Sequence, residues 1–80
     1  MKFKIGDRIK CLREHDGNKK IINKLGKIIH IPPTATSRWY TVEFDNNIGG
    51  HNSFGGKNGH TWNISDDKLI LCKKEPIFIE

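Results

Sequence analysis

The feature that most constrains this chain is the close spacing of residues that interrupt regular structure. Eight glycines, three prolines and many Asn and Asp residues divide its 80 residues into short pieces, and pieces of about five to eight residues have the usual length of a β-strand. None of the pieces repeats apolar residues at helical spacing. The sequence therefore predicts an all-β protein, and a single domain, because a chain this short cannot build two cores.

Five of these pieces have the character of strands. The clearest is 39–44, where Tyr40, Val42 and Phe44 fall on one face, as in a half-buried strand. One helical turn is expected at Ser65-Asp66-Asp67. The other expected strands are 7–13, 27–31, 60–64 and 68–72.

This layout predicts the architecture of the domain. Five short strands, with one helical turn before the last, are typical of a small SH3-like barrel, and closing the sheet would remove its exposed edges. We therefore expect an all-β, five-stranded SH3-like barrel over residues 1–72, with a long Gly-rich loop between the third and fourth strands. Residues 73–80, which contain Ile77-Phe78-Ile79, are expected to form a C-terminal tail or an extra edge strand.

Two parts of the chain resemble known families. The stretch Gly6-Asp7-Arg8-Ile9-Lys10, together with 24–31 and its Gly26, is similar to the opening strands of KOW and Mind-bomb-type SH3-like domains. The runs 42–51 and 56–62 resemble small SH3-like proteins of phages and prophages of low-GC bacteria. The resemblance covers residues 5–72. It implies an SH3-like fold and an origin in a mobile element, and it leaves the target open.

Residues 49–59 are the most unusual segment, because five of these eleven residues are glycine. One interpretation is a loop whose glycines let backbone N–H groups approach an anion, helped by Lys57 and by His51 and His60. The other is a long hairpin connection in which the two histidines hydrogen-bond the loop to itself. A loop of this length in a compact domain is often functional. We expect it to be mobile when free and to make the main contact with a partner.

The aromatic residues are more numerous than a thin core can enclose. Tyr40 and Trp62 fall on inward faces, whereas Trp39 alternates with Tyr40 and is expected to point outward. Phe54 lies in the middle of the Gly-rich loop. Exposed aromatics of this kind anchor protein partners or stack on nucleic-acid bases. The predicted partner-binding residues are Trp39, His51, Phe54, Lys57 and His60.

The chain is basic, with a formal net charge of +5. A surplus of this size permits binding to nucleic acid or to an acidic protein and does not choose between them. Most of the cations lie in the N-terminal half, where they would either meet phosphates or form a solvated surface that protects strand edges. The possible phosphate-binding residues are Arg8, Lys10, Lys19, Lys20, Lys24 and Lys27.

Catalytic and metal-binding groupings are not expected. His51, His60 and Lys57 are residue types of a ribonuclease-like site, but a glycine-rich hairpin is a poor scaffold for the precise geometry of acid–base catalysis. Cys11 and Cys72 lack the close spacing of zinc ligands, and we expect both to be free, buried thiols. No cofactor is expected. No apolar run is long enough to span a membrane or serve as a signal peptide, so we expect a cytoplasmic location. The resemblance to phage proteins implies that this is the cytoplasm of a bacterial host.

The predicted function is therefore binding without catalysis. The leading hypothesis is a phage- or mobile-element-type protein that binds and inhibits a host defence protein such as a CRISPR nuclease. The alternative is a nucleic-acid-binding KOW-like module that uses the basic face. A third hypothesis is a binder of a small anionic ligand in the Gly-rich loop. No membrane partner is expected, and the oligomeric state is left open.

Overall fold

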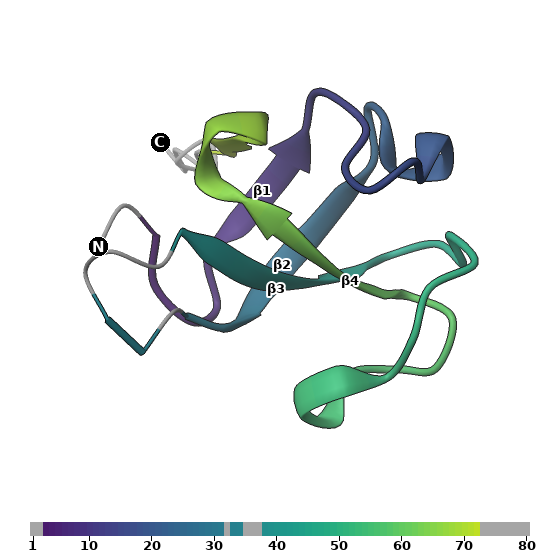
Figure 1. Cartoon of the computed structure of the whole chain (residues 1–80). Coiled ribbons are helices and arrows are strands. Elements are labelled where there is room, and N and C mark those ends of the chain that lie inside the picture. The colour runs from purple at the N-terminus through teal and green to yellow at the C-terminus, as the bar shows by residue number, and fades with distance from the viewer. Residues whose placement is uncertain (1–2, 32, 35–37, 73–80) are drawn as a thin grey trace, which may run out of the picture.

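The computed structural model describes residues 3–31, 33–34 and 38–72, and over these ranges the chain is all-β, as predicted (Figure 1). Helical structure in this part of the chain is limited to three 3₁₀ turns, and no helix in it is long and apolar enough to cross a membrane. The expected helical turn before the last strand is one of the three. The expected tail at 73–80 lies outside the described residues.

The strands are β1 (Arg8–Cys11), β2 (Leu25–His30), β3 (Trp39–Phe44), β4 (Thr61–Ser65) and β5 (Leu69–Leu71), and the turns are η1 (Lys19–Ile21), η2 (Ser53–Gly55) and η3 (Asp66–Lys68).

The strands form one antiparallel sheet in the order β4-β3-β2-β1-β5. The short turn η3 leads the chain away from the edge of β4, so that β5 adds to the free side of β1 instead. Within the described ranges β4 and β5 each pair with one strand only, so the sheet is open and the expected closure into a barrel is not found. Figure 1 shows β4 passing across β1 and β2 in projection, as expected for a strongly twisted sheet.

One hydrophobic cluster fills the inner face of the sheet. Tyr40, Val42 and Phe44 are at most 2% exposed, as their alternation predicted. Trp62 packs against this cluster and is half-buried, whereas Leu71 on the edge strand β5 is 45% exposed. The buried hydrophobic residues are Phe3, Ile9, Cys11, Ile21, Ile28, Tyr40, Val42, Phe44, Ile48, Ile64 and Leu69.

Candidate binding surface

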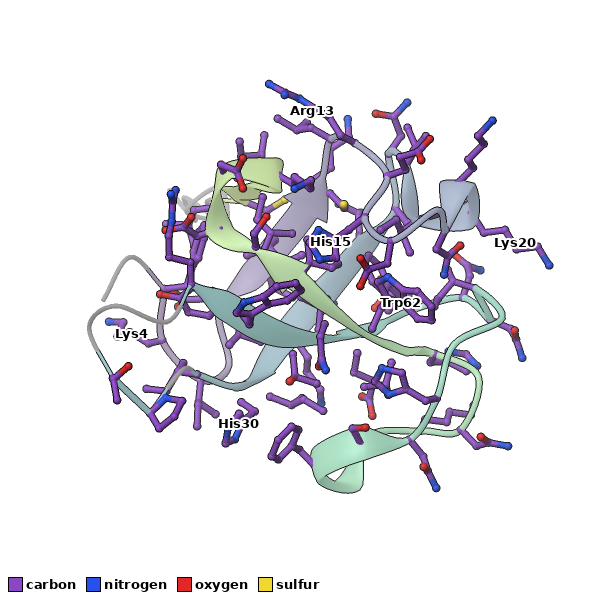
Figure 2. The ribbon with its side chains drawn as sticks, viewed as in Figure 1. Lys4, Arg13, His15, Lys20, His30 and Trp62 are labelled. Atoms are coloured by element: carbon purple, nitrogen blue, oxygen red, sulfur yellow. The ribbon has the colours of Figure 1, made fainter. Side chains whose placement is uncertain are left out.

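A β-bulge in β2 sets the direction of the His30 side chain. The register of β2 and β3 pairs Ile28 with Val42 and then His30 with Thr41, so that Ile29 is an extra residue on β2. In a regular strand His30 would face the core as Ile28 does, because residues two apart share a face. The bulge turns it to the outer face, and Figure 2 shows the ring beyond the strands, near the loop that carries η2. Bulges often re-aim a side chain in this way beside a functional site.

Phe54 stacks on this histidine from the tip of the β3–β4 connection. The ring centroids of His30 and Phe54 are 3.7 Å apart, and the ring planes differ by 9°. Phe54 remains 60% exposed. Its backbone φ is +56°, a left-handed conformation that costs a bulky L-residue about 1–2 kcal/mol. The chain thus holds an exposed aromatic residue in a strained backbone conformation, and this observation supports a functional role.

The base of the same connection, residues 45–60, is bound to β4. His51 and Thr61 form an antiparallel bridge in which each backbone N–H donates to the other residue's carbonyl oxygen, at 2.9 and 3.3 Å. A Cβ on Gly50 would lie 2.2 Å from the Thr61 carbonyl oxygen, and one on Gly56 would lie 2.1 Å from Thr61 Oγ1. Ile48 reaches the core and is 1% exposed. At Gly50 and Gly56, glycine thus allows close packing against Thr61. The mobility expected for the free loop stays a prediction.

The two loop histidines hydrogen-bond within this framework. His51 Nδ1 accepts from the backbone N–H of Ser53 at 3.2 Å, and its ring stacks on Trp62 at a centroid distance of 5.5 Å. His60 Nδ1 lies 2.9 Å from the Phe44 carbonyl oxygen. This is the bracing role that the sequence left as one of two interpretations.

Lys57 follows Phe54 by three residues in the same connection and is exposed. Its backbone N–H donates to Glu43 Oε2 at 2.8 Å, which fixes the main chain while the residue stays exposed. The other Glu43 oxygen lies 3.7 Å from Lys27 Nζ. The loop is therefore tied to β3 by a carboxylate as well as by the bridge to β4.

Trp39 is exposed as expected, but the strand separates it from the loop. It begins β3, whereas the loop leaves after Phe44, and five residue steps of strand span about 17 Å. Its ring, 48% exposed, makes an edge contact with His15 at a centroid distance of 4.7 Å. The predicted partner-binding residues thus divide into a loop group and one separate tryptophan.

His15 lies between the two tryptophans. It is 8% exposed, and its carbonyl oxygen accepts from Trp62 Nε1 at 3.0 Å. His15 Nε2 is buried with no hydrogen-bond partner in the described structure, although Asp16 Oδ2 is 3.6 Å away. Burial lowers the pKa of His15 below its usual value near 6.5.

The six predicted phosphate-binding residues do not form one uniform patch. Arg8 makes a bidentate pair with Asp45, at 2.9 and 2.7 Å, which raises the pKa of Arg8 and lowers that of Asp45. Lys27 lies beside Glu43, as described above. Three lysines lie in the β1–β2 connection or at its end, away from the Phe54 loop tip, and Figure 2 shows one of them, Lys20, directed outward. These three are Lys19, Lys20 and Lys24.

The two cysteines lie on opposite faces of the sheet. Cys11 is buried, its thiol donates to the Arg13 carbonyl oxygen at 3.0 Å, and burial raises its pKa. Leu71 lies opposite Ile9, a core residue, so the next residue, Cys72, belongs to the outer face. Cys72 is half-buried rather than buried as expected.

The described part of the chain contains no cluster of three or more His, Cys, Asp or Glu side chains suited to a metal ion, and it has no pocket. Comparison with protein-family models, with curated proteins and with solved structures found no match. The residues themselves therefore carry the functional argument.

Sequence reasoning missed His30 as the partner of Phe54. A regular alternation over 27–31 places His30 inside, and no turn residue in this stretch marks the extra position in the strand. The bulge is visible only in the pairing of β2 with β3, a strand distant in sequence, and the residues 27–31 alone do not indicate it.

Proposed function

We propose that this chain is a non-enzymatic binding module whose main contact with a protein partner is the exposed, strained Phe54 stacked on His30. The observation that carries the proposal is the convergence of two local departures from regular structure, the bulge at Ile29 and the positive φ of Phe54. The positive φ costs stability, and together the two departures present one ring to solvent.

A fixed aromatic ring is well suited to anchor a partner. Binding must otherwise immobilise a flexible side chain, at a cost of about 0.5–1.5 kcal/mol, and a ring that is already held avoids part of it. Lys57 adds an exposed cation to the same connection, whereas His51 and His60 brace the connection through their hydrogen bonds. We assign Trp39 to the rim of the contact or to a separate contact.

The SH3-like fold and the mobile-element origin belong to the same proposal. The strand order, with the last strand returning beside the first after one 3₁₀ turn, supports an SH3-like arrangement. The resemblance of 42–51 and 56–62 to phage and prophage proteins supports a partner in the bacterial host, and we propose that the chain inhibits a host defence protein such as a CRISPR nuclease.

The alternative function is nucleic-acid binding by the lysines of the β1–β2 connection. Lys19, Lys20 and Lys24 are exposed and are absent from the ion pairs found among the described residues, which favours this candidate. If it is correct, affinity for DNA or RNA should fall steeply and linearly on a log–log plot against salt concentration.

The test is affinity capture from lysate of a low-GC bacterium with the full chain as bait, with and without nuclease treatment. We expect a host protein to be retained after nuclease treatment by the wild type and lost with Phe54→Ser. Leu71→Ser is the matched control, because Leu71 is also an exposed large apolar residue but lies on the edge strand β5. The control should retain the protein.

Two results would contradict the proposal. Loss of all captured protein on nuclease treatment would favour the nucleic-acid alternative. Equal capture by wild type and Phe54→Ser, with both proteins folded by circular dichroism, would show that the contact lies elsewhere.

A further inference from the structure

A second surface lies on the outer face of β1, β2 and β5. Lys10 is opposite Leu25 on one side and opposite Ile70 on the other. Residues directly opposite in antiparallel strands share a face and lie about 4.5–5.5 Å apart. The three side chains therefore form one row across three strands, with a cation between two aliphatic groups.

The apolar members of this row are exposed. Leu25 is 42% and Ile70 is 44% exposed, although both lie within strands. Leu12 follows β1, is 41% exposed, and is held beside β5 by the hydrogen bond from its N–H to the Lys68 carbonyl oxygen. Single exposed aliphatic residues are ordinary, whereas several gathered around one lysine on the same face point to an interaction surface.

The charges around the row favour one kind of occupant. The next row along the strands contains Arg8 opposite Lys27, and both of these cations are already paired, with Asp45 and Glu43 respectively. Lys10 is half-buried between its aliphatic neighbours and makes none of the ion pairs found within the described residues. A partner carboxylate placed on Lys10 would thus meet an uncompensated cation in an apolar setting, where an ion pair is stronger than in water.

Other occupants fit this face less well. Aromatic side chains, on which bases stack, are absent from this row, and two of the nearby cations are neutralised, so the face lacks the features of a nucleic-acid groove. Pairing two copies of the face would bring Lys10 of each copy toward the other basic surface, which like-charge repulsion disfavours.

We propose that the face formed by Leu12, Leu25, Ile70 and Lys10 binds an acidic protein segment, in which a carboxylate lies between aliphatic side chains. The aliphatic groups of the segment pack on Leu25 and Ile70, and its carboxylate pairs with Lys10. This surface is separate from the Phe54 contact, so its existence does not depend on the proposed function.

The test uses a displayed library of random peptides selected on the full-length protein. We expect the enriched peptides to combine Asp or Glu with Leu, Ile or Val. Their affinity should fall at least about tenfold in Lys10→Glu and in the double variant Leu25→Ser/Ile70→Ser. Lys10→Gln should give an intermediate loss, and a selection repeated on Lys10→Glu should enrich Lys or Arg in place of the acidic residues.

Phe54→Ser is the matched control, because it removes an exposed apolar side chain from the other surface. It should bind the enriched peptides as the wild type does. All variants are first compared by thermal melting. The variants at Lys10, Leu25 and Ile70 should leave the melting temperature nearly unchanged, and Phe54→Ser should lower it slightly because it loses the stacking on His30.

Several outcomes would overturn the inference. Enriched peptides without an acidic bias, or peptides that bind Lys10→Glu as tightly as the wild type, would show that Lys10 does not select the partner. Binding lost in Phe54→Ser but kept in the double variant would move the site to the loop. Binding of a DNA oligonucleotide that Lys10→Glu abolishes would assign this face to nucleic acid, and a wild-type dimer that the double variant dissolves would assign it to self-association.

Discussion

The two long connections of the sheet, 12–24 between β1 and β2 and 45–60 between β3 and β4, are anchored alike but expose different chemistry. Each contains one isoleucine in the core, Ile21 and Ile48, both at most 1% exposed. Half of the other residues in the first connection are charged, whereas the second contains five glycines and an exposed phenylalanine. In each connection a buried isoleucine is one anchor among several contacts, which include the His51–Thr61 bridge in the second connection and the buried His15 in the first.

The two connections also contact each other. The Asn18 side chain donates from Nδ2 to the Ile48 carbonyl oxygen at 3.1 Å, while its Oδ1 accepts from the Lys20 N–H and so caps η1. One asparagine therefore orders both loops. The comparison predicts that loss of either anchor disturbs both connections.

The largest expected effect comes from removing an anchor. Ile21→Ala and Ile48→Ala should each lower the free energy of unfolding by about 2–5 kcal/mol, because each leaves a cavity in the core. Urea denaturation followed by tryptophan fluorescence measures this loss. Ile22→Ala, at a half-buried neighbouring position, should cost clearly less. A loss below about 1 kcal/mol for Ile48→Ala would break the comparison, since the second connection would then not depend on the core.

The next largest effect is expected for alanine substitution of a glycine in the second connection. It tests whether these glycines serve packing or flexibility. Gly56 has φ of −71°, which alanine tolerates, but the added Cβ would overlap Thr61 Oγ1. Gly56→Ala should cost about 1–3 kcal/mol by overpacking. Gly55, with φ of +80° and open space around its Cβ position, is the control. There alanine meets only backbone strain, about 1 kcal/mol.

A double-mutant cycle sharpens this result. If the clash with Thr61 causes the loss in Gly56→Ala, the same substitution should cost less in a Thr61→Ala background, where Oγ1 and Cγ2 are gone and only Ile29 Cδ1, at 2.9 Å, stays close. Additive losses would show that the cause is the local backbone rather than the contact between the two residues.

A smaller effect should appear as pH dependence, in different windows for the two connections. The pKa of His15 is lowered by burial in the folded state, so the unfolded chain binds more protons as pH falls. The contribution of His15 to stability should therefore be complete above a pH of about 6.5 and decrease below it. The pKa of Asp45 is lowered chiefly by its hydrogen bonds with Arg8, so that pair loses its contribution only below the ordinary aspartate range, near pH 4.

Unfolding free energies measured by urea denaturation from neutral pH down to about pH 3 test the direction of both predicted changes. His15→Gln should flatten the dependence between about pH 7 and pH 5, and Asp45→Asn should flatten it only in the more acidic window. A His15→Gln variant that keeps the full near-neutral slope would show that another group is responsible.

The sequence predicted the elements better than their assembly. Alternation over 39–44 correctly identified a strand with Tyr40, Val42 and Phe44 inside, because that strand has one buried face. The open edges and the buried Ile21 and Ile48 were not predicted, because both isoleucines lie in polar or glycine-rich stretches without periodicity. Their burial depends on contacts between distant segments.

In the candidate site, too, the properties of single residues could be predicted but the contacts between distant segments could not. Exposure of Phe54 and Trp39 could be predicted from the loop and from strand alternation. The stacking of Phe54 on His30 could not, since it requires a bulge whose position is set by the neighbouring strand. Likewise, Leu25 and Ile70 become neighbours of Lys10 only through the pairing of β2 and β5 with β1.

The smallest effect on stability is expected for Phe54→Asn. This variant also tests most directly whether the Phe54 ring serves partner binding and not folding. Loss of the ring removes its stacking on His30, worth about 0.5–1.5 kcal/mol. Asparagine tolerates a positive φ, so the substitution also relieves strain of about 1–2 kcal/mol. The two contributions nearly cancel, and the melting temperature should change little.

Phe54→Ala loses the stacking while most of the strain stays, so it should be the less stable of the two variants. If Phe54→Asn instead lowers the free energy of unfolding by more than about 2 kcal/mol, the ring is part of the fold. An unchanged stability together with lost partner binding is the combination expected of a residue that the loop holds out for recognition.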